Sequence, residues 1–159
     1  MKITILAVGK MKEKYFADAV LEYKKRLSRY CRLEIIEVAD EKTPDHASKQ
    51  EEEQIRRKEG ERLKKYIKDG AYVISLAIEG NQYSSEAFSK KIHKLGMERE
   101  SHIIFIIGGS IGLASDILKE SKELLSFSEM TFPHQLMRVV LLEQIYRGYR
   151  IMNGEPYHK

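Results

Sequence analysis

The chain has 159 residues, 42% of them hydrophobic, so it can form one ordinary core, and we expect a single domain over residues 1–159. Lys and Arg total 28 against 24 Asp and Glu, and the net charge of +4 permits an anionic partner without indicating one. The single cysteine, Cys31, excludes an internal disulfide framework and fits a reducing cytoplasm. We expect it to be a small buried hydrophobe rather than a nucleophile.

Several classes of site are disfavoured by the spacing of residues. The five histidines are scattered, without an HExxH pattern or a cysteine pair, so we predict no metal. The apolar stretch that starts at Ile3 becomes charged within the first ten residues, which is too short for a secretory signal. No apolar run reaches the roughly 18 residues of a membrane span. These patterns predict a soluble cytoplasmic protein without a membrane partner.

Four short apolar runs predict strands of a largely parallel sheet. A strand covered by helices on both faces has no solvent-exposed face, so its sequence is a nearly continuous apolar run instead of an alternating one. The nearly continuous runs are Ile3–Val8, Leu33–Val38 (less pure, with Glu34 and Glu37), Ala71–Ile78 and Ile103–Ile107.

Helical periodicities lie between and after these runs, and the alternation of the two patterns predicts an α/β fold. The second helical segment is mostly charged, which is typical of a solvated helix with a narrow buried edge. The predicted helices cover Met11–Tyr30, about His46–Lys68, the segment of Phe88, Ile92 and Leu95 behind a cap at Ser84 or Ser85, Ala114–Leu118 and His134–Met152. The last of them carries more than one apolar stripe, so we expect it to thread into its own domain or to pack against a second subunit.

A glycine-rich turn follows the predicted strand Ile103–Ile107, where Gly108, Gly109 and Gly112 allow the backbone to approach a ligand closely. The GGxxG spacing differs from the dinucleotide pattern, and no Lys-Ser/Thr pair follows as in a Walker A loop. A nucleoside without phosphates, such as S-adenosylmethionine, is therefore favoured as a ligand. A tight turn without any ligand is an equally supported reading.

Three segments at strand ends together resemble the motifs of the SPOUT methyltransferases. They are Leu76–Gly80, Ile107–Leu113 and Ser126–Arg138. The N-terminal ILAVGKMK and the tail Asn153–Lys159 narrow the resemblance to the large subunit methyltransferase H branch, and it covers essentially the whole chain. The resemblance implies a SPOUT α/β-knot, with a largely parallel sheet flanked by helices and a C-terminal trefoil knot. It also implies a homodimer whose active site is completed by the other subunit.

The resemblance also implies which positions border S-adenosylmethionine. They are Leu76, Gly108, Phe127, Ser128, Glu129, Met130, Thr131 and Phe132. Apolar side chains would give the adenine a dry slot while backbone groups read its edge. The alternatives are that Leu76 and Phe127 are core residues and that Phe132 is a staple before the last helix.

The implied reaction is methylation of N3 of a pseudouridine in 23S rRNA of the assembled ribosome. The imide nitrogen must lose its proton, so the site needs alignment, a proton acceptor and groups that stabilise charge on the neighbouring carbonyls. We expect His158 to accept the proton, Tyr157 to orient the base and Arg138 to be the catalytic arginine. The alternative for the tail is terminal disorder. Arg147 and Arg150 would hold RNA phosphate or be merely solvated.

Two other functions remain open at this point. One is a SPOUT enzyme that acts on tRNA or on a ribose 2′-hydroxyl, although such proteins usually carry added RNA-binding segments. The other is a nucleotide-binding module that uses the glycine turn without catalysis.

Overall fold

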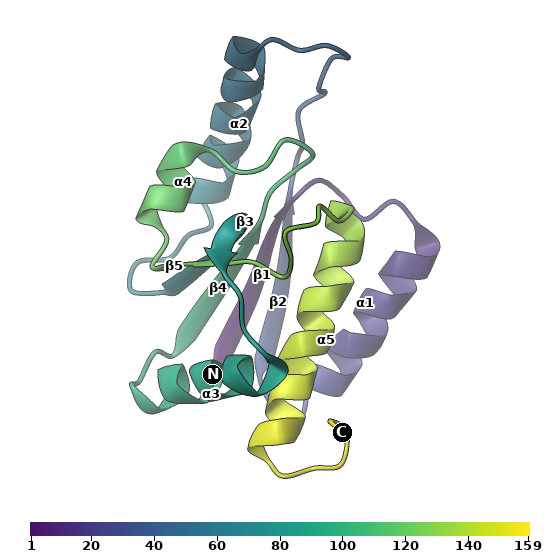
Figure 1. Cartoon of the computed structure of the whole chain (residues 1–159), viewed down its shortest axis with the longest axis vertical. Helices are drawn as coiled ribbons and strands as arrows, with labels where there is room; N and C mark the ends of the chain where they lie inside the picture. Colours follow the sequence, from purple (N-terminus) through teal and green to yellow (C-terminus); the bar gives the residue numbers. More distant parts are fainter.

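Five parallel strands form one sheet in the computed structural model, which describes residues 1–159 (Figure 1). Their order across the sheet is β2-β1-β4-β3-β5. The strands are β1 (Lys2–Val8), β2 (Arg32–Val38), β3 (Tyr72–Asn81), β4 (His102–Ile107) and β5 (Glu123–Leu125). The predicted α/β class with a parallel sheet is confirmed, and each of the four apolar runs forms a strand.

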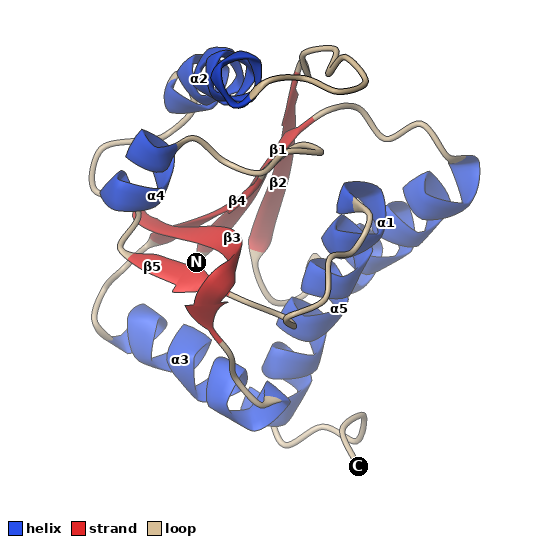
Figure 2. Cartoon of the chain, turned by 45° about the horizontal axis from the view of Figure 1, so that its top comes forward, coloured by secondary structure: helices blue, strands red, loops and turns tan.

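Helices cover both faces of this sheet, with α1, α3 and α5 on one face and α2 and α4 on the other (Figure 2). The helices are α1 (Lys14–Leu27), α2 (Lys49–Lys64), α3 (Ser85–Met97), α4 (Ser115–Glu120) and α5 (His134–Met152). Two layers of helices explain why the central strands β1 and β4 are largely apolar.

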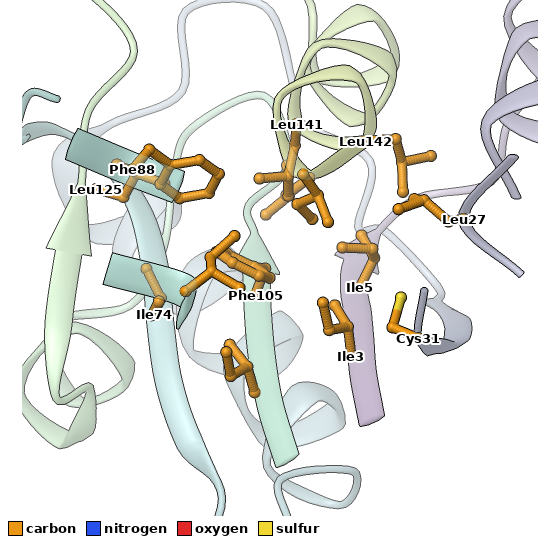
Figure 3. Packing of buried hydrophobic residues seen from close by; sticks show 14 of the residues in the cluster. Ile3, Ile5, Leu27, Cys31, Ile74, Phe88, Phe105, Leu125, Leu141 and Leu142 are labelled. Atoms are coloured by element: carbon orange, nitrogen blue, oxygen red, sulfur yellow. The ribbon is translucent and has the colours of Figure 1, made fainter. Parts of the chain in front are cut away.

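Alternate residues of β1 show how the two cores are built. Ile3 and Ile5 point into the layer of α1, α3 and α5, and they belong to the same core cluster as Leu141 and Leu142 of the last helix (Figure 3). Leu6 and Val8 belong to the other core, against α2 and α4. Because side chains alternate along a strand, β1 needs apolar residues facing both cores, which explains its unbroken apolar run from Ile5 to Val8.

Local differences from the predicted bounds have identifiable causes. Helix α2 begins later than expected because Ser48 caps it. The Ser48 hydroxyl accepts from the backbone N–H of Glu51, and the Glu51 carboxylate accepts from the backbone N–H of Ser48. Strand β3 continues to Asn81 because Asn81 pairs with Leu125 of β5. Strand β5 was not predicted, since three residues are too few to show a period.

Helix α5 packs beside α1 and α3, and Leu141, Leu142 and Ile145 are fully buried (Figure 1). Val139 and Val140 are half-buried and lie outside both core clusters. The chain itself therefore covers only part of the apolar surface of α5. Neither α5 nor any other helix combines the length and apolar character needed to cross a membrane.

Cys31 belongs to the core beneath α1. Burial raises the pKa of its thiol to about 11, so little thiolate exists at neutral pH. The expectation of a buried small hydrophobe is confirmed.

Replacing Leu142 by alanine is expected to lower the free energy of unfolding by about 2–5 kcal/mol, because the side chain is fully buried between α5, α1 and the sheet. The matched control is Leu21→Ala, since Leu21 lies on α1 and is 62% exposed; its effect should stay within about 0.5 kcal/mol. Denaturant unfolding followed by circular dichroism measures both. Equal effects would contradict the packing described for α5.

Candidate functional site

A cavity of about 500 Å³ opens where β3, β4 and β5 end. Its walls come from three separated segments: the end of β3, the glycine turn after β4, and the loop of residues 126–132 before α5. The volume lies within the roughly 300–1,000 Å³ range of small-molecule sites, and ligands of parallel α/β sheets bind outside the carboxyl ends of the strands. This cavity is the candidate site.

Most of the predicted cofactor residues line this one cavity. Those that do are Leu76, Gly108, Phe127, Ser128, Met130, Thr131 and Phe132. Glu129 is exposed and does not line it. Leu76 and Phe127 also pack against the core, so the alternative reading of these two as core residues describes part of their environment. That the set binds a cofactor stays a prediction.

The turn after β4 is tight enough to require glycine. A Cβ on Gly108 would lie 2.8 Å from the carbonyl carbon of Gly112, and Gly112 has a positive φ of 82°. The N–H of Gly112 donates to the carbonyl of Gly109 at 3.1 Å, which closes the turn. The backbone therefore forms this wall without side chains that would fill the cavity.

The loop of residues 126–132 is fixed by a close crossing of two chain segments. A Cβ on Gly80 would lie 2.6 Å from the carbonyl carbon of Leu124, and the N–H of Ser126 donates to the carbonyl of Asn81 at 2.9 Å. The Ser126 hydroxyl then donates to the carbonyl of Ser128 at 3.0 Å. These contacts hold the loop against the end of β3.

Residues that the sequence analysis did not single out also line the cavity. Ile78 and Ser110 lie inside the motif segments, so their position in those segments was an available signal. Arg56 comes from α2, and its guanidinium donates to the carbonyl of Ile111 at 3.3 Å. No local pattern in the charged sequence of α2 distinguishes Arg56 from its neighbours.

His134 begins α5, as the sequence predicted, and also lines the cavity. Burial lowers its pKa, and the positive charges of Arg138 and Lys12 lower it further. The imidazole is therefore neutral near pH 7. A mainly apolar cavity with hydroxyl groups and a neutral histidine suits a nucleoside better than a phosphate.

Arg138 is only 2% exposed and does not line the cavity. Its guanidinium donates to the Glu37 carboxylate at 2.5 Å and to the carbonyls of Val8 and Gly9 at 3.0 and 2.6 Å. These contacts are those of a residue that positions α5 on the sheet, and the predicted catalytic role of Arg138 stays a prediction. These contacts were not predictable from local sequence, because the partners lie 101 to 130 residues away along the chain.

The C-terminal tail is folded against α5 and α3 rather than free. The Tyr157 hydroxyl donates to Glu143 at 3.2 Å, and the Arg147 guanidinium lies 4.6 Å from the Tyr157 ring centroid. Nε2 of His158 lies 2.8 Å from a carboxylate oxygen of Glu86. Within one chain, the tail packs at the C-terminal part of α5, whereas the cavity lies at its start (Figure 1).

Arg150 also holds the tail, through an ion pair with Glu155 and a hydrogen bond of 3.1 Å to the carbonyl of Pro156. With 19 residues, α5 spans about 28 Å. Tyr157 and His158 are therefore brought together with each other but not with the cavity of their own chain.

Comparison with known proteins agrees with this geometry. A family model described as "Predicted SPOUT methyltransferase" matches residues 1–158. The chain is 65% identical to ribosomal RNA large subunit methyltransferase H of Bifidobacterium adolescentis and 62% identical to that of Clostridium kluyveri, and both matches cover the whole of both chains.

A solved structure of a probable methylase family protein from Haemophilus influenzae shares the fold. The TM-score is 0.57 at 12% identity, over 99% of this chain and 70% of the other. The resemblance seen in the motifs is thus confirmed at the level of the whole chain. The chain belongs to the SPOUT methyltransferases, in the ribosomal RNA large subunit methyltransferase H family.

Proposed function

We propose that the protein transfers a methyl group from S-adenosylmethionine to N3 of a pseudouridine in 23S rRNA of the assembled ribosome. The observation that carries this proposal is that all three motif segments line one cavity at the carboxyl edge of the sheet. The name shared by relatives at 62–65% identity supports ribosomal RNA as the substrate. The reaction would then take place in the cytoplasm, where assembled ribosomes are.

The residues of the cavity fit S-adenosylmethionine. Leu76, Ile107 and Phe127 offer apolar surface for the adenine, and Ser128 and Thr131 offer hydroxyls for its polar groups. The glycine turn contributes backbone at a place where a Cβ could not fit. When bound there, the cofactor supplies an electrophilic methyl group.

The chain's own residues must align the base and take its imide proton. Inside the cavity of one chain the proton acceptors are weak, because burial lowers the pKa of His134 and Glu79 is an ordinary exposed carboxylate at the rim, while Arg56 is cationic. Tyr157 and His158 have the required chemistry: an aromatic ring stacks on an unstacked base, and an imidazole accepts a proton near neutral pH. We propose that they act in the cavity of a second subunit.

A homodimer accounts for this separation of groups. Ile78, Met130 and Phe132 are exposed apolar side chains at the cavity, and Val139 and Val140 extend the apolar surface along α5. A second copy would cover this surface and bring its own tail toward the cavity. We further propose that the C-terminal segment passes through a loop of the chain as a trefoil knot, a proposal supported by the close crossing at Gly80.

Gly108→Ala is expected to weaken binding of S-adenosylmethionine by roughly tenfold or more, because the new Cβ forces the turn away from Gly112. Gly148→Ala is the matched control: its Cβ would meet atoms no closer than 3.6 Å, and alanine suits a helix interior. Titration calorimetry measures both affinities. Wild-type affinity in Gly108→Ala would remove the turn from the cofactor site.

Deleting residues 157–159 is expected to reduce methylation by about a hundredfold or more while S-adenosylmethionine still binds, because the tail lies far from the cavity of its own chain. Tyr157→Phe should lose less than about tenfold, since it removes one hydrogen bond and keeps the ring. Deletion of exposed Lys159 alone serves as the control. Transfer of radiolabelled methyl to ribosomes is the measurement, and full activity of the truncated protein would exclude the tail from the mechanism.

Assembled ribosomes are expected to be methylated at least about tenfold faster than free large subunits or tRNA. The net charge of +4 is small for a protein that binds free RNA, so we expect recognition to rely on the shape of a large assembly. Mass spectrometry of rRNA nucleosides would identify the methylated base. Equal rates on free subunits, or methylation of tRNA, would contradict the assigned substrate.

A further inference from the structure

Residues 9–13, here called the lysine loop, connect β1 to α1 beside the start of α5. The chain leaves β1 at Gly9, whose φ of 89° favours glycine. The loop then carries Lys10 and Lys12 at exposed positions. No ion pair joins either lysine to a carboxylate, whereas Lys14 at the start of α1 is paired with Asp18 at 2.6 Å.

The backbone of this loop is held by side chains from other elements. The Glu37 carboxylate of β2 accepts from the N–H of Met11 at 2.6 Å, and the same carboxylate binds Arg138. The Gln135 side-chain oxygen accepts from the N–H groups of Lys12 and Glu13 at 3.0 and 3.2 Å. The loop is therefore ordered before any partner binds, which reduces the entropy lost on binding.

The same turn of α5 holds both the lysine loop and the wall of the cavity. His134 and Met137 line the cavity, while Gln135 and Arg138 bind the loop. A Cβ on Gly9 would lie 3.7 Å from Nε2 of His134, so the loop passes directly beside a residue of the cavity. The unpaired positive charges therefore stand next to the site where a nucleotide would enter.

We propose that the lysine loop binds the phosphodiester backbone of the RNA beside the target nucleotide, with Lys10 and Lys12 contacting phosphates. This proposal rests on the proposed function and adds to it the surface that receives the RNA. Phosphate contacts position a nucleic acid without reading its sequence, and lysine is suited to them as a compact point charge. Glu37, Gln135 and Arg138 act as positioning residues for the loop.

The test compares Lys10→Ala/Lys12→Ala with the unaltered full-length protein in methylation of ribosomes at several salt concentrations. The double variant is expected to raise KM for ribosomes by roughly tenfold with kcat nearly unchanged, and to reduce the slope of log KM against log salt by about 2. Affinity for S-adenosylmethionine should stay within about twofold, because neither lysine lines the cavity.

Two further variants control for charge and for folding. Lys24→Ala/Lys25→Ala removes the same charge from the far, exposed end of α1 and should leave KM within about twofold. Lys10→Arg/Lys12→Arg should restore wild-type KM. Unchanged KM and salt slope in the Lys10/Lys12 alanine variant, with normal methylation by the unaltered protein, would overturn the lysine-loop proposal alone. Absence of methylation by the unaltered protein would overturn the proposed function and the loop proposal with it.

Discussion

The buried guanidinium of Arg138 attaches the start of α5 to the carboxyl edge of the sheet, and the site depends on that attachment. Its donors satisfy two backbone carbonyls where β1 ends and the carboxylate of Glu37 on β2. Removing one partner of such a buried pair typically costs about 3–5 kcal/mol, because the other charge is left without compensation. Because 33% of the Glu37 side chain remains exposed, solvent screens part of this interaction.

Two glycines also shape the site, because they let backbone segments approach each other where a Cβ would collide. At Gly80 the end of β3 crosses the segment that leads into the loop of residues 126–132, and at Gly108 the turn after β4 folds onto itself. A parallel sheet places the ends of its strands on one edge. The three motifs, far apart in sequence, therefore form one cavity.

Much of the fold could be predicted from local patterns. Strands that are apolar at most positions indicated a sheet covered on both faces, and the bounds of α5 agree with its apolar periodicity. The short β5 carries no period, and the contacts of Arg138 join residues 101 to 130 positions apart, so neither was visible locally. The cavity residues came from the family resemblance, because the apolar character of Leu76 or Phe127 fits a core equally well. The folded tail depends on pairings such as His158 with Glu86, which no spacing in the sequence indicates.

The central claim is that one subunit supplies the cofactor cavity and the other supplies the tail. It is tested most directly with a mixed dimer, co-expressed with two affinity tags, of one Gly108→Ala subunit and one subunit that lacks residues 157–159. Such a dimer contains one site with an intact cavity and an intact tail, so it should methylate ribosomes at about half the rate of the wild-type dimer. A mixed dimer as inactive as either parent dimer, or a protein that is monomeric when active, would contradict the account.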